Sequence, residues 1–151
     1  MLETAVTHAR RAGDPRSAAR AASGYATVAL GGPTPVAAAI ERCETLLADV
    51  RGDRKAEAVI LGVLAQLHAM RGEFDEARSM AARGREMLDD LGPSVTAAST
   101  STESYRVEVL AGDLAAAERD LRRDHDRLEA MDEHYLRSTI AALLAGVLVE
   151  E

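Results

Sequence analysis

The sequence predicts an all-α protein built from stacked pairs of antiparallel helices. Three glycines, Gly32, Gly72 and Gly112, lie forty residues apart, and each is followed five residues later by an alanine. Hydrophobic residues make up 47% of the chain but aromatic residues only 3%, and alanine, the strongest helix former, is abundant. Such a period with small residues in register is typical of a helical repeat array, in which each helix pair buries its apolar face against its neighbours.

Turns that contain glycine or proline divide the chain into eight expected helices. The first turn should end one helix and start the next, with Asp14 as the N-cap and Pro15 in the first helical position. Thr34 and Pro35 should repeat this arrangement after Gly32. The start and stop signals predict helices at about 2–12, 15–30, 35–50, 54–71, 74–91, 94–111, 114–131 and 134–150.

We expect these helices to form a single domain of repeat units. The predicted boundaries are a half unit at 1–12, full units at 15–52, 53–92 and 93–132, and a half unit at 133–151. Half units at both ends predict that the chain is part of a longer array.

The last helix is apolar on almost all sides and should therefore be buried. With only a half unit around it, this helix has few expected partners inside the chain. We therefore predict a symmetric homodimer through the C-terminal helix. The expected contact residues are Ile140, Leu143, Leu144 and Val147.

Part of the chain resembles the tetratricopeptide repeat. The segment from Met70 to Ala77 has the family's glycine before the turn, an aromatic residue (Phe74) after it, and a small residue on the second helix. The period is forty residues rather than the family's 34, and the large aromatic near the start of the first helix is absent. The resemblance implies a lengthened, right-handed superhelix of stacked antiparallel helix pairs. The positions that carry it are Leu61, Leu64, Ala65, His68, Gly72, Phe74, Ala77, Ala81 and Gly84.

A narrower resemblance points to a biological setting. Residues 32–44, 70–78, 109–120 and 135–144 are similar to the C-terminal repeat region of large actinobacterial regulators, which join a nucleotide cyclase domain, an ATPase domain and a helical repeat tail. This chain has neither a phosphate-binding glycine loop nor a pair of metal-binding carboxylates of the cyclase type. The resemblance implies the non-catalytic repeat tail of a bacterial signalling or transcriptional regulator.

The first helix of each unit lines the concave groove in proteins of the resembled family, and this implies where a partner binds. Mapped onto this chain, the candidate groove residues are Gln66, Met70, Ser99, Thr102 and Arg106. The groove is mostly apolar, which favours recognition of a peptide or helix in another protein over recognition of an acidic tail. The alternative is a small-molecule sensor or carrier with a pocket between the helices.

Charge and composition exclude several other classes of function. The net charge is −7, from 25 acidic and 18 basic residues, and this disfavours nucleic acid or an anionic membrane as a partner. The longest apolar run, residues 140–149, is too short to span a bilayer. The single cysteine, Cys43, allows no internal disulfide, and we expect a cytoplasmic protein.

No group of residues predicts catalysis or a cofactor. His125 and Glu129 have the spacing of two metal ligands on one helix, but a solvated helix face explains them more simply. His68 takes a packed position, and Cys43 is expected to be an inert, partly buried thiol. We therefore predict that the protein is not an enzyme and needs no metal.

Overall fold

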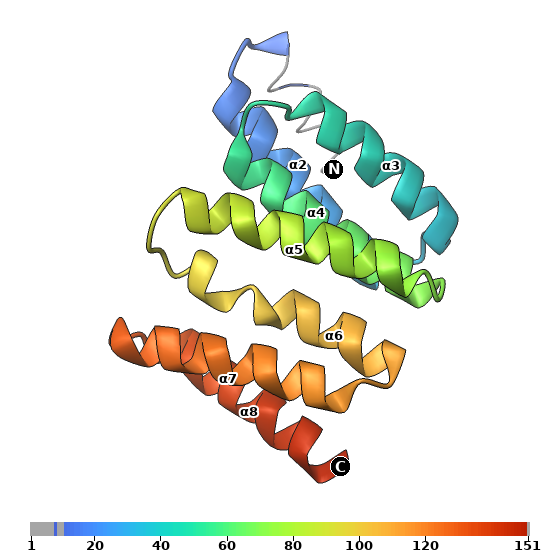
Figure 1. The fold of residues 1–151 in the computed structure, drawn as a ribbon. Helices are drawn as coiled ribbons and strands as arrows, with labels where there is room; N and C mark the ends of the chain where they lie inside the picture. Colours follow the sequence, from blue (N-terminus) through green and yellow to red (C-terminus); the bar gives the residue numbers. More distant parts are fainter. Residues whose placement is uncertain (1–7, 9–10, 151) are drawn as a thin grey trace.

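The computed structural model describes residues 8 and 11–150, and within them the fold is all-α (Figure 1). This confirms the predicted class. The elements are α2 (Pro15–Gly31), α3 (Val36–Asp49), α4 (Arg54–Met70), α5 (Phe74–Asp90), a short 3-10 helix η1 (Ala97–Ser99), α6 (Ser101–Ala111), α7 (Leu114–Ala130) and α8 (Tyr135–Glu150). The helix expected at 2–12 lies almost wholly outside the described residues.

The helices form a stack that runs from α2 and α3 at one end to α7 and α8 at the other (Figure 1). Helix α4 lies inside the stack, in contact with α2, α3, α5 and α6. Leu64 and its neighbours on α4 are therefore buried on nearly every side. Helix α8, at the end of the stack, packs mainly on α7.

Aspartate caps start several of the helices. The Ser17 backbone N–H donates to Asp14 Oδ1 at 3.1 Å, and Pro15 is the first residue of α2, as predicted. Asp53 and Asp113 cap α4 and α7 in the same way. These bonds satisfy backbone donors that have no partner within the helix itself.

The turn that contains Gly32 differs from the turns at the other two register glycines. Gly72 and Gly112 have left-handed backbones, with φ of 79° and 77°. Gly32 is extended, at φ −86° and ψ 171°, because the proline that follows it excludes the helical region. The cap predicted at Thr34 is also wrong, since Pro35 takes the N-cap position without a side-chain hydrogen bond.

The helix predicted over 94–111 is interrupted. A 3-10 turn at Ala97–Ser99 precedes α6, which begins at Ser101. The cap of α6 comes from another helix: the Ser101 N–H donates to Asp124 Oδ2 of α7 at 2.6 Å, and the Thr100 hydroxyl donates to the same oxygen at 3.3 Å. Asp124 is fully buried. This tertiary cap lets α6 start seven residues later than we predicted.

One half-buried carboxyl group, that of Glu103, predicts how the stability of the protein should change with pH. Glu103 of α6 lies over Gly62 of α4, and a methyl group added at Gly62 would be 3.5 Å from Glu103 Cγ. Burial raises the pKa of this carboxyl above 4.5, the negative charge of Asp124 adds to the rise, and a hydrogen bond from Thr102 and the charge of Arg106 oppose it.

We expect Glu103→Gln to stabilise the protein at neutral pH. The raised pKa means that the folded state favours the protonated carboxyl of Glu103. The stabilisation that the protonated carboxyl gives to the folded state is therefore fully present below pH 4.5, and it is lost as pH rises through the folded-state pKa. Glutamine is neutral at every pH and keeps an acceptor for Thr102. Urea unfolding from pH 4 to pH 8 should show the gain growing with pH, whereas the exposed control Glu44→Gln should show no such trend. An equal pH trend in both variants would contradict the assignment.

Candidate functional site

Two predicted groove residues, from different predicted repeat units, meet in the structure. Arg106 of α6 donates through Nη1 to Gln66 Oε1 of α4 at 3.4 Å, and the two residues are forty positions apart. Gln66 is buried, and its amide nitrogen donates to the Gly62 carbonyl at 3.4 Å. Because both ends of the amide are engaged, Gln66 positions the guanidinium rather than offering free groups of its own.

Arg106 itself is exposed. Its guanidinium carbon lies 5.9 Å from the centre of the Tyr105 ring, within the range of a cation–π contact. The Arg106 Nε–H also donates to the Tyr105 hydroxyl at 3.3 Å. The side chain is therefore oriented by two neighbours, and the guanidinium still has N–H groups to offer, since it carries five donors.

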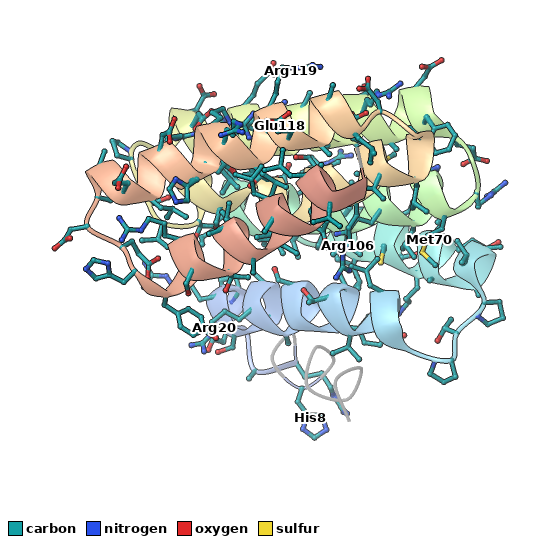
Figure 2. All side chains as sticks on the ribbon, turned by 90° about the horizontal axis from the view of Figure 1, so that it is seen from below. His8, Arg20, Met70, Arg106, Glu118 and Arg119 are labelled. Atoms are coloured by element: carbon teal, nitrogen blue, oxygen red, sulfur yellow. The ribbon has the colours of Figure 1, made fainter. Side chains whose placement is uncertain are left out.

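Apolar side chains lie one turn further along each of the two helices. Met70 on α4 is 52% exposed and Leu110 on α6 is 51% exposed. These two residues are again forty positions apart, which is the period of the predicted repeat. We call Gln66, Met70, Tyr105, Arg106 and Leu110 the Arg106 patch. Figure 2 shows Arg106 and Met70 near the middle of the view, and Glu118 and Arg119 of α7 at its upper edge.

Ser99 and Thr102 do not extend this patch with free hydroxyls. The Thr102 hydroxyl lies 2.8 Å from the Ser99 carbonyl and 2.9 Å from Glu103 Oε2, and the Ser99 hydroxyl donates to the Thr96 carbonyl at 3.3 Å. Both residues are half-buried near the break between η1 and α6. Their hydroxyl groups serve the local backbone at the start of the helix.

Two of the four residues predicted for self-association lie inside the chain. Ile140 and Val147 are buried in a cluster with residues of α7, so their side chains are not available to a second molecule. Leu143 and Leu144 are half-buried against the same cluster. The predicted contact surface is therefore wrong at Ile140 and Val147, because α8 packs on α7 through the apolar stripe that contains them. The large hydrophobic residues that α8 does expose are Tyr135 at its start and Leu148 and Val149 near its end, at 79%, 43% and 87%.

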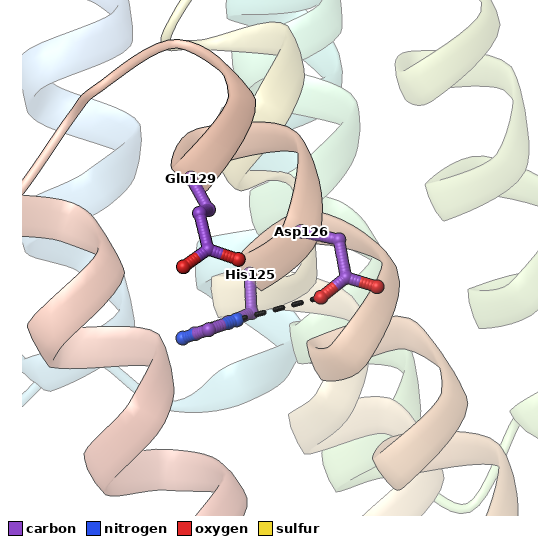
Figure 3. Close-up of side chains that lie close together, drawn as sticks. All are labelled: His125, Asp126 and Glu129. Atoms are coloured by element: carbon purple, nitrogen blue, oxygen red, sulfur yellow. Dashed lines mark ion pairs between the residues drawn. The ribbon is translucent and has the colours of Figure 1, made fainter.

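His125 and Glu129 lie close together on α7, with Asp126 beside them (Figure 3). One ligand atom from each of the three lies within 4.8 Å of the others, and His125 Nδ1 is 3.5 Å from Asp126 Oδ1. Asp126 and Glu129 are exposed, and Arg137 of α8 pairs with Glu129 at 3.3 Å. Three such groups could contact zinc or a similar ion, but a closed zinc site needs a fourth ligand and Arg137 competes for Glu129. A solvated face still explains these residues.

A cleft of about 940 Å³ lies between the start of α2 and the turn that joins α3 to α4. Its charged lining residues include Asp14, Arg16, Asp53, Arg54 and Lys55. The N-termini of α2 and α4 border this cleft, but Asp14 and Asp53 already accept their backbone N–H groups. The alternative prediction of a small-molecule sensor would place its ligand in this cleft.

The two residues predicted to be structural are buried. His68 packs inside the stack, and its Nδ1 lies 2.6 Å from Glu73 Oε2. Cys43 is fully buried, and burial raises the pKa of its thiol to about 11. The thiolate, which is the reactive form, is therefore scarce at neutral pH.

Sequence reasoning missed the polar seam between α6 and α7. Besides capping α6, Asp124 accepts from Arg123 Nε at 2.9 Å, and one turn earlier Asp120 accepts from the Ser104 hydroxyl at 2.5 Å and from Arg123 Nη1 at 2.8 Å. A signal was present: Asp124 falls in the apolar stripe of α7, three residues after Leu121 and four before Leu128. A charged residue in a core stripe indicates a buried polar partner.

Comparison with known proteins leaves the family open. No protein-family model matches the chain, and no curated protein sequence matches it. None of the described helices has the length and apolar character needed to cross a membrane.

Proposed function

We propose that this chain is a non-catalytic protein-interaction module, the repeat tail of a bacterial signalling regulator, which binds a peptide or helix of another protein. The binding face would be the concave side of a tetratricopeptide-like superhelix. One observation carries the proposal: residues in equivalent positions of neighbouring repeats, Gln66 and Arg106, are hydrogen-bonded to each other beside exposed apolar side chains.

The packing order supports a continuous binding face. Helix α4 contacts both α2 before it and α6 after it, so the first helices of three successive predicted units lie against one another. Solenoid proteins present extended surfaces of this kind to their ligands. The Arg106 patch spans two of these helices, which is the span that an extended peptide or a short helix would need.

The chemistry of the patch indicates what the partner should carry. Met70 and Leu110 offer apolar contacts, and a methionine side chain adapts easily to differently shaped partners. Arg106 has only donors, so it needs a carbonyl or carboxylate oxygen on the partner. The best ligand is an apolar peptide or helix with one hydrogen-bond acceptor opposite Arg106.

A peptide-display selection against the purified chain tests this proposal. We expect the selected peptides to share apolar residues around one acceptor, and their affinity to fall at least about tenfold, or ~1.4 kcal/mol, in Arg106→Glu. Met70→Glu should weaken binding similarly, because it places a charge among apolar contacts. Fluorescence anisotropy with labelled peptides gives the dissociation constants.

The matched control is Arg119→Glu, which makes the same charge change at an exposed site of α7 away from Arg106 (Figure 2). It should bind the selected peptides as the native chain does. If Arg106→Glu and Arg119→Glu lose the same affinity for the peptides, the change in net charge would explain the loss. That result would contradict the proposed binding face. Peptides that bind both variants at full affinity would place the binding surface elsewhere.

A further inference from the structure

Helix α8 is the structural equivalent of α4, two repeats further along the chain. Both helices follow a left-handed residue, Gly52 at φ 101° and Asp132 at φ 55°. The next residue caps the helix in each case: Asp53 accepts from the N–H of residue 56 at 3.0 Å, and Glu133 from the N–H of residue 136 at 2.7 Å. These positions all differ by eighty, which is twice the forty-residue period.

The equivalence extends to the core. Ile60 and Leu67 of α4 are buried, and so are their counterparts Ile140 and Val147 of α8. These two positions, which face the preceding helix pair, are therefore buried in both helices. The two helices differ on the opposite face.

In α4, that opposite face is covered by α5. Ala58, Leu61 and Ala65 are buried beneath it, and a methyl group added at Gly84 of α5 would lie 3.0 Å from the Ala58 carbonyl oxygen. The contact is close because α5 offers small residues, Ala77 and Gly84, seven positions apart.

In α8, the corresponding residues Ser138, Ala141 and Ala145 are all exposed. Leu148 and Val149 extend the exposed apolar surface toward the end of the helix. We call this surface the α8 outer face, with the residues Ser138, Ala141, Ala142, Ala145, Leu148 and Val149. In α4 the equivalent surface is filled by an antiparallel helix with small residues, so the same kind of helix is what this face fits.

We propose that the α8 outer face binds the α8 outer face of a second copy of this chain. Each α8 would then cover the other as α5 covers α4. A two-fold axis across the helix makes the two α8 helices antiparallel, as α4 and α5 are. The face also has the small residues that this geometry requires, since Ser138 and Ala145 are seven positions apart, like Ala77 and Gly84.

Charge favours a second copy over an unrelated partner. In a symmetric interface residue i contacts residue j of the partner and j contacts i, so a face that carried charge of one sign would repel its own copy. The segment from Ser138 to Val149 has no charged residue, although 28% of the chain is charged. This contact is independent of the Arg106 patch, and either proposal can fail without the other.

Sedimentation analysis of the full chain over a wide range of concentrations tests the mass directly. We expect a species of twice 16.1 kDa that higher salt does not weaken, because the interface is uncharged. The double variants Ala141→Lys with Ala145→Lys, and Ala141→Glu with Ala145→Glu, should each weaken dimerisation at least about tenfold. These positions are exposed in a single chain, so the helical circular dichroism should be unchanged.

Mixing the two double variants separates a symmetric contact from any other. Opposite charges then face each other, and a dimer that contains one of each should form and weaken as salt is added. The control Ala48→Lys, at an exposed position of α3 at the other end of the stack, should dimerise like the native chain.

Two results would overturn the proposal. One is a native chain that stays at 16.1 kDa at every concentration, and in that case binding of a synthetic peptide with the sequence of α5 would show that the face takes a different helix. The other is a native dimer that both lysine and glutamate variants leave intact, because the contact would then lie elsewhere.

Discussion

Replacing Asp124 by alanine should destabilise the protein by about 3–5 kcal/mol, the largest effect that we expect from a single substitution. The carboxylate is fully buried and accepts from the Ser101 N–H, the Thr100 hydroxyl and Arg123 Nε. Alanine would leave the start of α6 without its cap and Arg123 without a buried partner. Urea unfolding followed by circular dichroism measures the loss directly.

The matched control is Asp126→Ala, which removes the same group from the exposed side of the same helix. Its effect should stay within about 0.5 kcal/mol, as is usual for a surface site. Hydrogen exchange adds a local test, because the Ser101 amide should lose protection in Asp124→Ala before the core of α4 does. Equal destabilisation by the two substitutions would show that the buried cap contributes little.

Gly84→Ala should destabilise the protein by about 1–2 kcal/mol, although alanine is the better helix former. The added methyl group would lie 3.0 Å from the Ala58 carbonyl oxygen and 3.5 Å from Leu61 Cβ. A backbone oxygen cannot rotate away, so α5 would have to move off α4. The cost of that movement exceeds the gain in helix propensity, which is about 0.5–1 kcal/mol.

Gly24→Ala is the control, with the opposite expected sign. Gly24 lies inside α2, and a methyl group added there would meet no atom within 4 Å. This substitution should therefore stabilise the protein by about 0.5–1 kcal/mol. Thermal unfolding of both variants and of the native chain measures whether each substitution raises or lowers the stability. A Gly84→Ala variant that is more stable than the native chain would show that α4 and α5 are not so closely packed.

The candidate site was only partly predictable. The forty-residue period placed Gln66 and Arg106 in equivalent positions, and the structure brings them together at 3.4 Å. The same reasoning named Ser99 and Thr102, whose hydroxyls the structure engages locally beside the break before α6. A periodic pattern assumes that every predicted unit folds alike, and it failed where the helix predicted over 94–111 is interrupted.

The sequence by itself determined the all-α class, most of the helix boundaries and the cap of α2. These features depend on helix propensity and on hydrogen bonds between residues three or four positions apart, so they can be inferred from local sequence. Asp14 and Pro15 are the clearest case, because the cap and the first helical residue are both where we predicted them.

Only the tertiary structure decided where α6 begins and which side of α8 is buried. The cap of α6 comes from Asp124, 23 residues away from Ser101, so no local pattern could reveal it. Helices α4 and α8 are both apolar on most sides, but α4 lies among four neighbours while α8 packs mainly on α7. Apolar character shows that a helix needs burial, and the position of the helix in the stack decides which of its faces is buried.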